Sequence, residues 1–172
     1  MQKHWLWLVY AITTVVAWGI WGALISRPTD AGFPETLVYV VWSLTMIPPA
    51  LIALWFIGFK LEYDARSVLL GCAAGFTGAG GQLILFKAVN MAPAYLVFPF
   101  VALSPMVTIL MAALLSGERV SKFGMIGIIL ALVAGLLVPE VATDDKQASG
   151  LLWVALAILV LLAWGVQGFI IS

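Results

Sequence analysis

The segment from Ala94 to Ser116 carries no charged side chain, and it constrains the fold more than any other feature. At a rise of about 1.5 Å per residue, a helix of this length crosses a hydrocarbon core of about 30 Å. Pro99 and Pro105 interrupt the segment, and each removes a backbone donor. The helical hydrogen bonds of Tyr95 and Val101 are therefore weakened. Because broken backbone at membrane depth survives only against protein or water, this helix is predicted to face the interior of a bundle.

The composition places the whole chain in a membrane. Of its 172 residues, 64% are hydrophobic and 9% are charged, which is too little polar surface to cover a soluble globule. Eight basic residues balance eight acidic ones, so no basic excess favours nucleic acid. The sequence predicts an all-α polytopic helical bundle with six transmembrane helices, joined by short loops that make neighbouring helices antiparallel. The predicted spans are Trp5 to Ile25, Leu37 to Phe59, Val68 to Ala88, Ala94 to Ser116, Phe123 to Val138 and Leu151 to Ile171.

The loops predict the orientation of the chain. Cytoplasmic loops carry an excess of lysine and arginine, and this excess favours a cytoplasmic N-terminus. With that orientation the inner side holds Lys3, Lys60, Arg66, Arg119 and Lys122, and the outer side holds Arg27, Lys87 and Lys146.

Rows of small residues predict close helix packing. Gly71, Gly75 and Ala79 are spaced by four residues and share one helix face. A second row has the same spacing and consists of Gly127, Ala131 and Gly135. Both faces are expected to lie against neighbouring helices.

An internal repeat links the two ends of the chain. Aligning Trp7 to Ser26 with Trp153 to Ser172 pairs two tryptophans and two glycines in register, and among these pairs Trp18 matches Trp164. Because the second copy lies five spans after the first, the copies cross the membrane in opposite directions. Such inverted repeats underlie many secondary transporters, whose substrate sites lie near the midplane.

Several features together resemble the EamA domain of the drug/metabolite transporter superfamily, over roughly Leu6 to Val138. They follow in order: Ala92-Pro93, the proline-broken span, the exit from Gly117 to Arg119, and the glycine-spaced helix from Gly124 to Leu137. The resemblance implies five-plus-five helices and transport of an amino acid, metabolite or drug-like solute by alternating access across a bacterial-type inner membrane. The expected organisation is an EamA-like domain at 5–138, an external polar loop at 139–150, and the first helix of a truncated second repeat at 151–172.

Candidate site residues are polar or aromatic groups at membrane depth, where they are costly. We name as substrate-cavity candidates Trp18, Gln82, Tyr95, Pro99, Pro105 and Trp164. Core packing is the alternative for the two tryptophans, and an interhelical hydrogen bond is the alternative for Gln82. The sequence contains one histidine and one cysteine, and no spacing typical of metal ligands, so we predict no enzyme, metal site or cofactor.

Charged and polar residues near the span ends are gating or vestibule candidates. Lys87 and Asn90 share a face at an outer helix end, where Lys87 could instead extend to the interface. Glu118 is expected to pair with Lys122 or to mark the end of the helix, or else to act in gating or proton coupling.

Three interpretations of function remain open. The first is a transporter whose partners are the bilayer, a small-molecule substrate and a missing second half. The second is a homodimer of oppositely oriented chains. The third is a membrane scaffold without transport. In all three, Gly165, Gln167 and Gly168 of the last span lack second-half helices to pack against, so self-association is expected.

Overall fold

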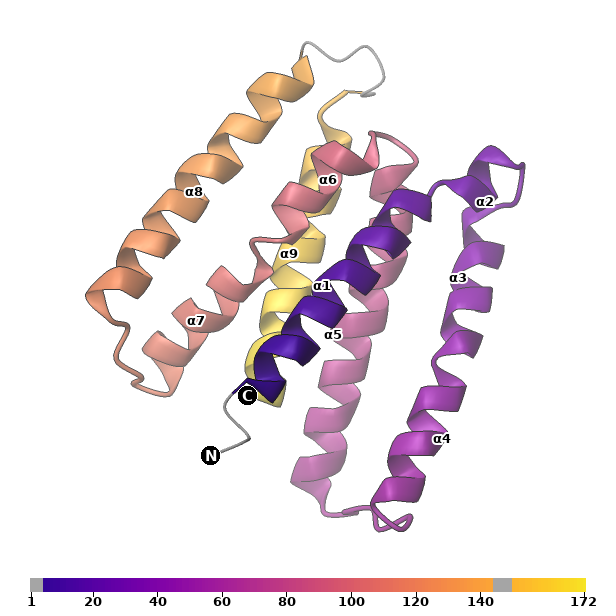
Figure 1. The fold of residues 1–172 in the computed structure, drawn as a ribbon, viewed down its shortest axis with the longest axis vertical. Helices are drawn as coiled ribbons and strands as arrows, with labels where there is room; N and C mark the ends of the chain where they lie inside the picture. Colours follow the sequence, from indigo (N-terminus) through magenta and orange to yellow (C-terminus); the bar gives the residue numbers. More distant parts are fainter. Residues whose placement is uncertain (1–4, 144–149) are drawn as a thin grey trace.

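The computed structural model describes residues 5–143 and 150–172, and this part of the chain is helical, with no strand (Figure 1). Of the external loop predicted at 139–150, residues 139–143 belong to the helix Lys122–Thr143, and 144–149 lie outside the described residues. The helices are α1 (Leu6–Leu24), α2 (Arg27–Asp30), α3 (Glu35–Thr45), α4 (Ile47–Phe56), α5 (Ala65–Val89), α6 (Ala94–Val101), α7 (Ser104–Leu115), α8 (Lys122–Thr143) and α9 (Leu152–Ile171).

The helices confirm the predicted polytopic membrane bundle. Five described stretches are long and apolar enough to span a membrane: Leu6–Asp30, Glu35–Phe56, Ala65–Val89, Ala94–Leu115 and Leu152–Ile171. The remaining predicted span falls in α8, where the apolar stretch Lys122–Ala134 is shorter. The protein is therefore a multi-pass membrane protein.

Prolines break two of the spans. The predicted break separates α6 from α7 at Ala102 and Leu103, because Pro105 lies in the first turn of α7 and has no N–H to continue the helix. Pro99 lies inside α6. A second break, at Met46 between α3 and α4, was not predicted, and Pro48 follows it within the first turn of α4.

Helix α9 packs against the first-repeat helices α5, α6 and α7 (Figure 1). Thr108 of α7 donates its hydroxyl to the Gly165 carbonyl at 2.9 Å. A Cβ on Gly165 would meet Val107 and would lie 2.9 Å from the Ser104 carbonyl oxygen. Gly168 approaches Thr108 in the same way. The first repeat therefore covers this glycine face, which was expected to lack second-half neighbours, and the expected self-association stays a prediction.

The close contacts of α5 lie on a different face from the predicted row. No described atom comes within 4 Å of a Cβ built on Gly71 or Gly75, and the same holds for Gly127 of α8. The close positions are Gly78, which faces Gln167, and Gly81, which faces Trp164. The predicted row has a spacing of four residues. Helix α9 instead contacts the face of α5 that carries Gly78 and Gly81, which are three residues apart.

Helix α3 is attached to α5 by a side-chain hydrogen bond. The Tyr39 hydroxyl donates to the Ala79 carbonyl at 3.2 Å, and the Tyr39 ring lies edge-on to Phe86 at a centroid distance of 6.4 Å. At the N-terminal end of α5, Asp64 caps the helix by accepting from Ser67 N–H at 3.0 Å and Arg66 N–H at 3.1 Å. Hydrogen bonds from the Ser67 hydroxyl and from these N–H groups lower the pKa of Asp64.

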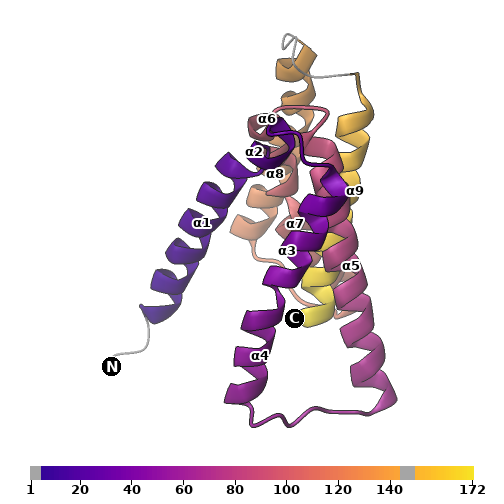
Figure 2. The same ribbon diagram turned by 90° about the vertical axis from the view of Figure 1, so that its right-hand side faces the viewer.

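Helix α1 stands apart from the bundle over most of its length. Figure 2 shows its N-terminal half splayed away from α3, α5 and α9, with the approach made at its C-terminal end. There Gly22 and Ile25 are buried, whereas 5–20 are exposed. The core lies at this same end, where α1, α5, α6 and α9 meet.

The α9 contact predicts a stability difference between two glycine-to-alanine variants. Gly165→Ala adds a methyl group against the Ser104 carbonyl, and overpacking of this kind costs about 1–3 kcal/mol. Gly71→Ala is the matched control, because its Cβ meets open space and alanine favours helix. Thermal unfolding in detergent should show a lower midpoint for Gly165→Ala alone. Equal midpoints would contradict the packing of α9.

Candidate functional site

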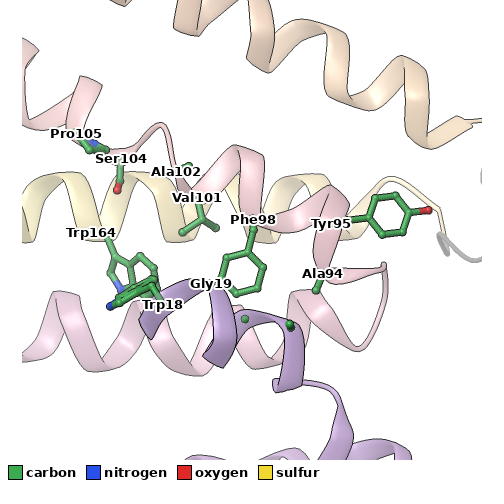
Figure 3. Close-up of a pocket in the computed structure, with 12 residues that line it drawn as sticks. Trp18, Gly19, Ala94, Tyr95, Phe98, Val101, Ala102, Ser104, Pro105 and Trp164 are labelled. Carbon is green, nitrogen blue, oxygen red and sulfur yellow. The ribbon is translucent and has the colours of Figure 1, made fainter. Parts of the chain in front are cut away.

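A cavity of about 470 Å³ lies at the break between α6 and α7 (Figure 3). Helix α1 closes one side, and α9 contributes one tryptophan. The break itself forms part of the wall, because Val101, Ala102 and Ser104 all line the cavity. The complete lining is Trp18, Gly19, Gly22, Ala23, Ala94, Tyr95, Phe98, Val101, Ala102, Ser104, Pro105 and Trp164.

Two tryptophans meet at this cavity, and they are the pair that the internal repeat aligns. The rings of Trp18 and Trp164 lie edge to face, with centroids 5.3 Å apart and an interplanar angle of 78°. The Trp164 Nε1–H donates to the Gly78 carbonyl at 3.2 Å, which fixes the orientation of its indole. Gly81 makes this possible, because a Cβ there would lie 2.6 Å from Trp164 Cδ1.

Further aromatic rings hold the cavity wall in place. Trp21 lies 5.6 Å from Trp18, and it contacts Phe98 edge-on at 6.1 Å (centroid distances). The Phe98 ring packs on Gly22, where a Cβ would be 3.0 Å from Phe98 Cζ. Edge-to-face pairs of this kind contribute about 0.5–1.5 kcal/mol each beyond burial. The end of α1 is thus fixed to α6 through rings.

The cavity wall carries no charged side chain. Its side-chain hydrogen-bonding groups are the Ser104 and Tyr95 hydroxyls and the indole N–H groups of the tryptophan pair. In Figure 3 the Tyr95 ring points away from that pair. The Val101 carbonyl lacks its usual helical donor, because Pro105, four residues later, has no N–H.

The structure brings together four of the six predicted cavity residues. Trp18, Tyr95, Pro105 and Trp164 line the cavity, so they lie where a ligand would contact them. Pro99 lies in the interior of α6 and is not part of the lining.

Gln82 does not line the cavity either. It is only 3% exposed, and its Nε2 has no hydrogen-bond partner among the described residues. It lies one turn before Phe86, on the helix that receives the Tyr39 hydroxyl. A buried amide without a hydrogen-bond partner is energetically costly. Gln82 nevertheless lies outside the cavity wall at the α6–α7 break.

Two of the three predicted gating or vestibule residues, Lys87 and Asn90, line a second, polar pocket of about 700 Å³ at the C-terminal end of α5. Lys87 Nζ lies 3.2 Å from Glu35 Oε1, so Lys87 forms an ion pair. Sequence reasoning missed Glu35 as the partner, although its place in an outer loop gave the signal. The lining is Ser26, Thr29, Asp30, Phe33, Pro34, Glu35, Thr36, Lys87, Val89 and Asn90.

The expected pair between Glu118 and Lys122 does not form. Among the described residues the ion pair is that of Lys87 and Glu35. Gly117 adopts a φ of +70° and ends the α7 region, and the Glu118 N–H then donates to the Ala112 carbonyl at 3.2 Å. Because of this turn, Glu118 and Lys122 do not belong to one continuous helix, so their side chains do not share a helix face.

Comparison with known families gives one match. The model of the EamA-like transporter family matches residues 5–138, which include every element of the cavity except α9. No curated protein and no solved structure matches the chain. Because the match covers most of the chain, the protein belongs to the EamA-like transporter family.

Proposed function

We propose that the protein is a secondary transporter that moves a small solute through the α6–α7 cavity by alternating access, without ATP. The observation that carries the proposal is the contact between Trp18 and Trp164 in the cavity wall. The sequence pairs these two residues as equivalents in an inverted repeat. Two residues exchanged by a two-fold axis touch each other only if both lie beside that axis.

The position of the cavity fits this symmetry. In transporters with inverted repeats, the axis lies in the membrane plane and the substrate binds near the midplane. Ser104 begins α7 and falls near the middle of the span Ala94–Leu115. The proposed axis and the cavity therefore lie at the same depth.

The helix break supports movement at this depth. Discontinuous helices at the midplane are a recurrent feature of secondary transporters, because the freed backbone groups can bind solute and the break can bend. Here the break joins two short helices at Ala102 and Leu103.

The partner of this chain is proposed to be a second five-helix repeat. Helix α9 already fills the groove between α5 and α7, and the repeat relates α9 to α1. By the same symmetry α1 would enter the corresponding groove of a second repeat, which accounts for its exposed residues 5–20. A homodimer of oppositely oriented chains is less favoured, because in each copy α9 already occupies that groove. We propose an inner-membrane location with a cytoplasmic N-terminus.

Cysteine labelling in oriented vesicles tests the topology. With Cys72→Ala as background, Asp30→Cys should react with an impermeant thiol reagent only from outside, and Ser121→Cys only from inside. The reason is that Asp30 and Ser121 lie at opposite ends of the bundle (Figure 1). The reverse pattern would refute the proposed orientation.

Alternating access predicts labelling of one cavity residue from both sides. Ser104→Cys, in the same background, should react in right-side-out vesicles and also in inside-out vesicles, because the cavity opens to each side in turn. Asp30→Cys and Ser121→Cys serve as controls, because each is expected to react from one side only. A scaffold without transport would leave Ser104→Cys accessible from one side at most, and that result would sink the proposal.

Removing a proline at the break should slow this exchange. Pro105→Ala restores the N–H that can bond the Val101 carbonyl and favours a continuous helix. We expect labelling of Ser104→Cys from the less accessible side to slow by about tenfold, since a change of about 1.4 kcal/mol in the barrier suffices. Pro48→Ala, at the break outside the cavity, is the matched control. Unchanged labelling rates would show that the Pro105 break is not a hinge.

A further inference from the structure

We propose that the cavity accepts a solute with an aromatic body and a single positive charge, an aromatic primary amine, and rejects its carboxylate counterpart. This inference rests on the proposed function, because it takes the α6–α7 cavity to be the transport site. The observation behind it is that the cavity wall offers more groups that bind a positive charge than groups that bind a negative one.

The aromatic side chains favour a flat, cationic ligand. Trp18, Phe98 and Trp164 line the cavity from three different helices. Ring faces attract ammonium groups, and tryptophan does so best, with a stronger effect where water is excluded. Trp18 is 46% exposed, so part of its indole is available to a ligand.

The backbone at the break adds to this preference. Helix α6 ends at Val101, and the C-terminal end of a helix carries partial negative charge. The Val101 carbonyl has lost its helical donor, because Pro105 has no N–H. Unwound carbonyls and half-helix C-termini coordinate cations in other transporters with broken helices.

Groups that would receive a carboxylate are few. No lysine or arginine lines the cavity. Lys87, a basic residue at the end of a span, lies in the other pocket and pairs with Glu35. The Trp164 N–H is already bonded to the Gly78 carbonyl. An ionised carboxylate would find neither a basic side chain nor an attractive ring face to offset its desolvation, whereas an ammonium group would find the ring faces.

The size of the cavity sets the upper limit of the ligand. A volume of about 470 Å³ lies within the range of roughly 300–1,000 Å³ that is usual for small-molecule sites. An indole with a two-carbon amine chain fits this space, and its amine is protonated at neutral pH because alkyl ammonium groups titrate near 10.

A matched set of indoles tests the charge preference. Radiolabelled tryptamine is bound to the purified full chain in detergent and displaced by unlabelled tryptamine, tryptophan, indole or indole-3-acetate. These compounds share the ring and differ mainly in charge. We expect tryptophan and indole-3-acetate to compete at least about tenfold more weakly than tryptamine, with indole between them. Equal or tighter competition by either carboxylate would overturn the proposal.

Variants locate the binding to the cavity. Trp18→Ala should weaken tryptamine binding about tenfold, whereas Trp18→Phe retains a ring and should lose less. Trp55→Ala is the control, because Trp55 is an exposed tryptophan of α4 that does not line the cavity. Equal losses for Trp18→Ala and Trp55→Ala would place the binding elsewhere and overturn the proposal.

Two measurements separate this inference from the proposed function. If Ser104→Cys is labelled from both sides but tryptamine does not bind, the transporter stands and the substrate class is wrong. If tryptamine binds with the expected preference but labelling is one-sided, the binding site stands and alternating access is wrong.

Discussion

The contact between α5 and α9 is the interaction on which the rest of the structure depends. Lipid tails are as apolar as leucine, so helices in a bilayer associate through close packing and interhelical hydrogen bonds. Here Gly78 and Gly81 let α9 approach α5, and the Trp164 N–H bonds the Gly78 carbonyl. Once α9 is placed, its opposite face receives α7 at Gly165, and Trp164 is held in the cavity wall. The cavity thus follows from two glycines on one helix.

Features set by local chemistry could be predicted from the sequence. The lack of charges located the spans, and the missing N–H of Pro105 located the break between α6 and α7. Pro48 gave the same signal for the break at Met46. That break was not predicted, because Pro48 lies within an apolar run that was interpreted as one span. What could not be predicted was the choice of neighbours. Sequence spacing shows which residues share a face, but not which helix covers that face, so the α9 contacts appeared only in the structure.

The candidate site shows the same limit. Trp18 and Trp164 could be found by comparing the chain with itself, because equivalent residues beside a two-fold axis are close by symmetry. Gln82 was predicted because it is polar and lies at membrane depth. Neither property shows which way its side chain points. In the structure Gln82 is not part of the cavity lining, and its side chain is buried. Glu35 was overlooked because its partner Lys87 lies far along the chain, and ion pairs between distant segments leave no local pattern.

Two consecutive carbonyls of α5 receive side-chain donors from two different helices. Gly78 accepts from Trp164 of α9, and Ala79 accepts from Tyr39 of α3. Successive residues of a helix point about 100° apart, so the two donors approach α5 from different sides. A sliding or rotation of α5 would have to break both bonds together, in a medium that offers no replacement partners. We therefore expect α3, α5 and α9 to act as one frame, against which α1 and the two halves of the broken span shift.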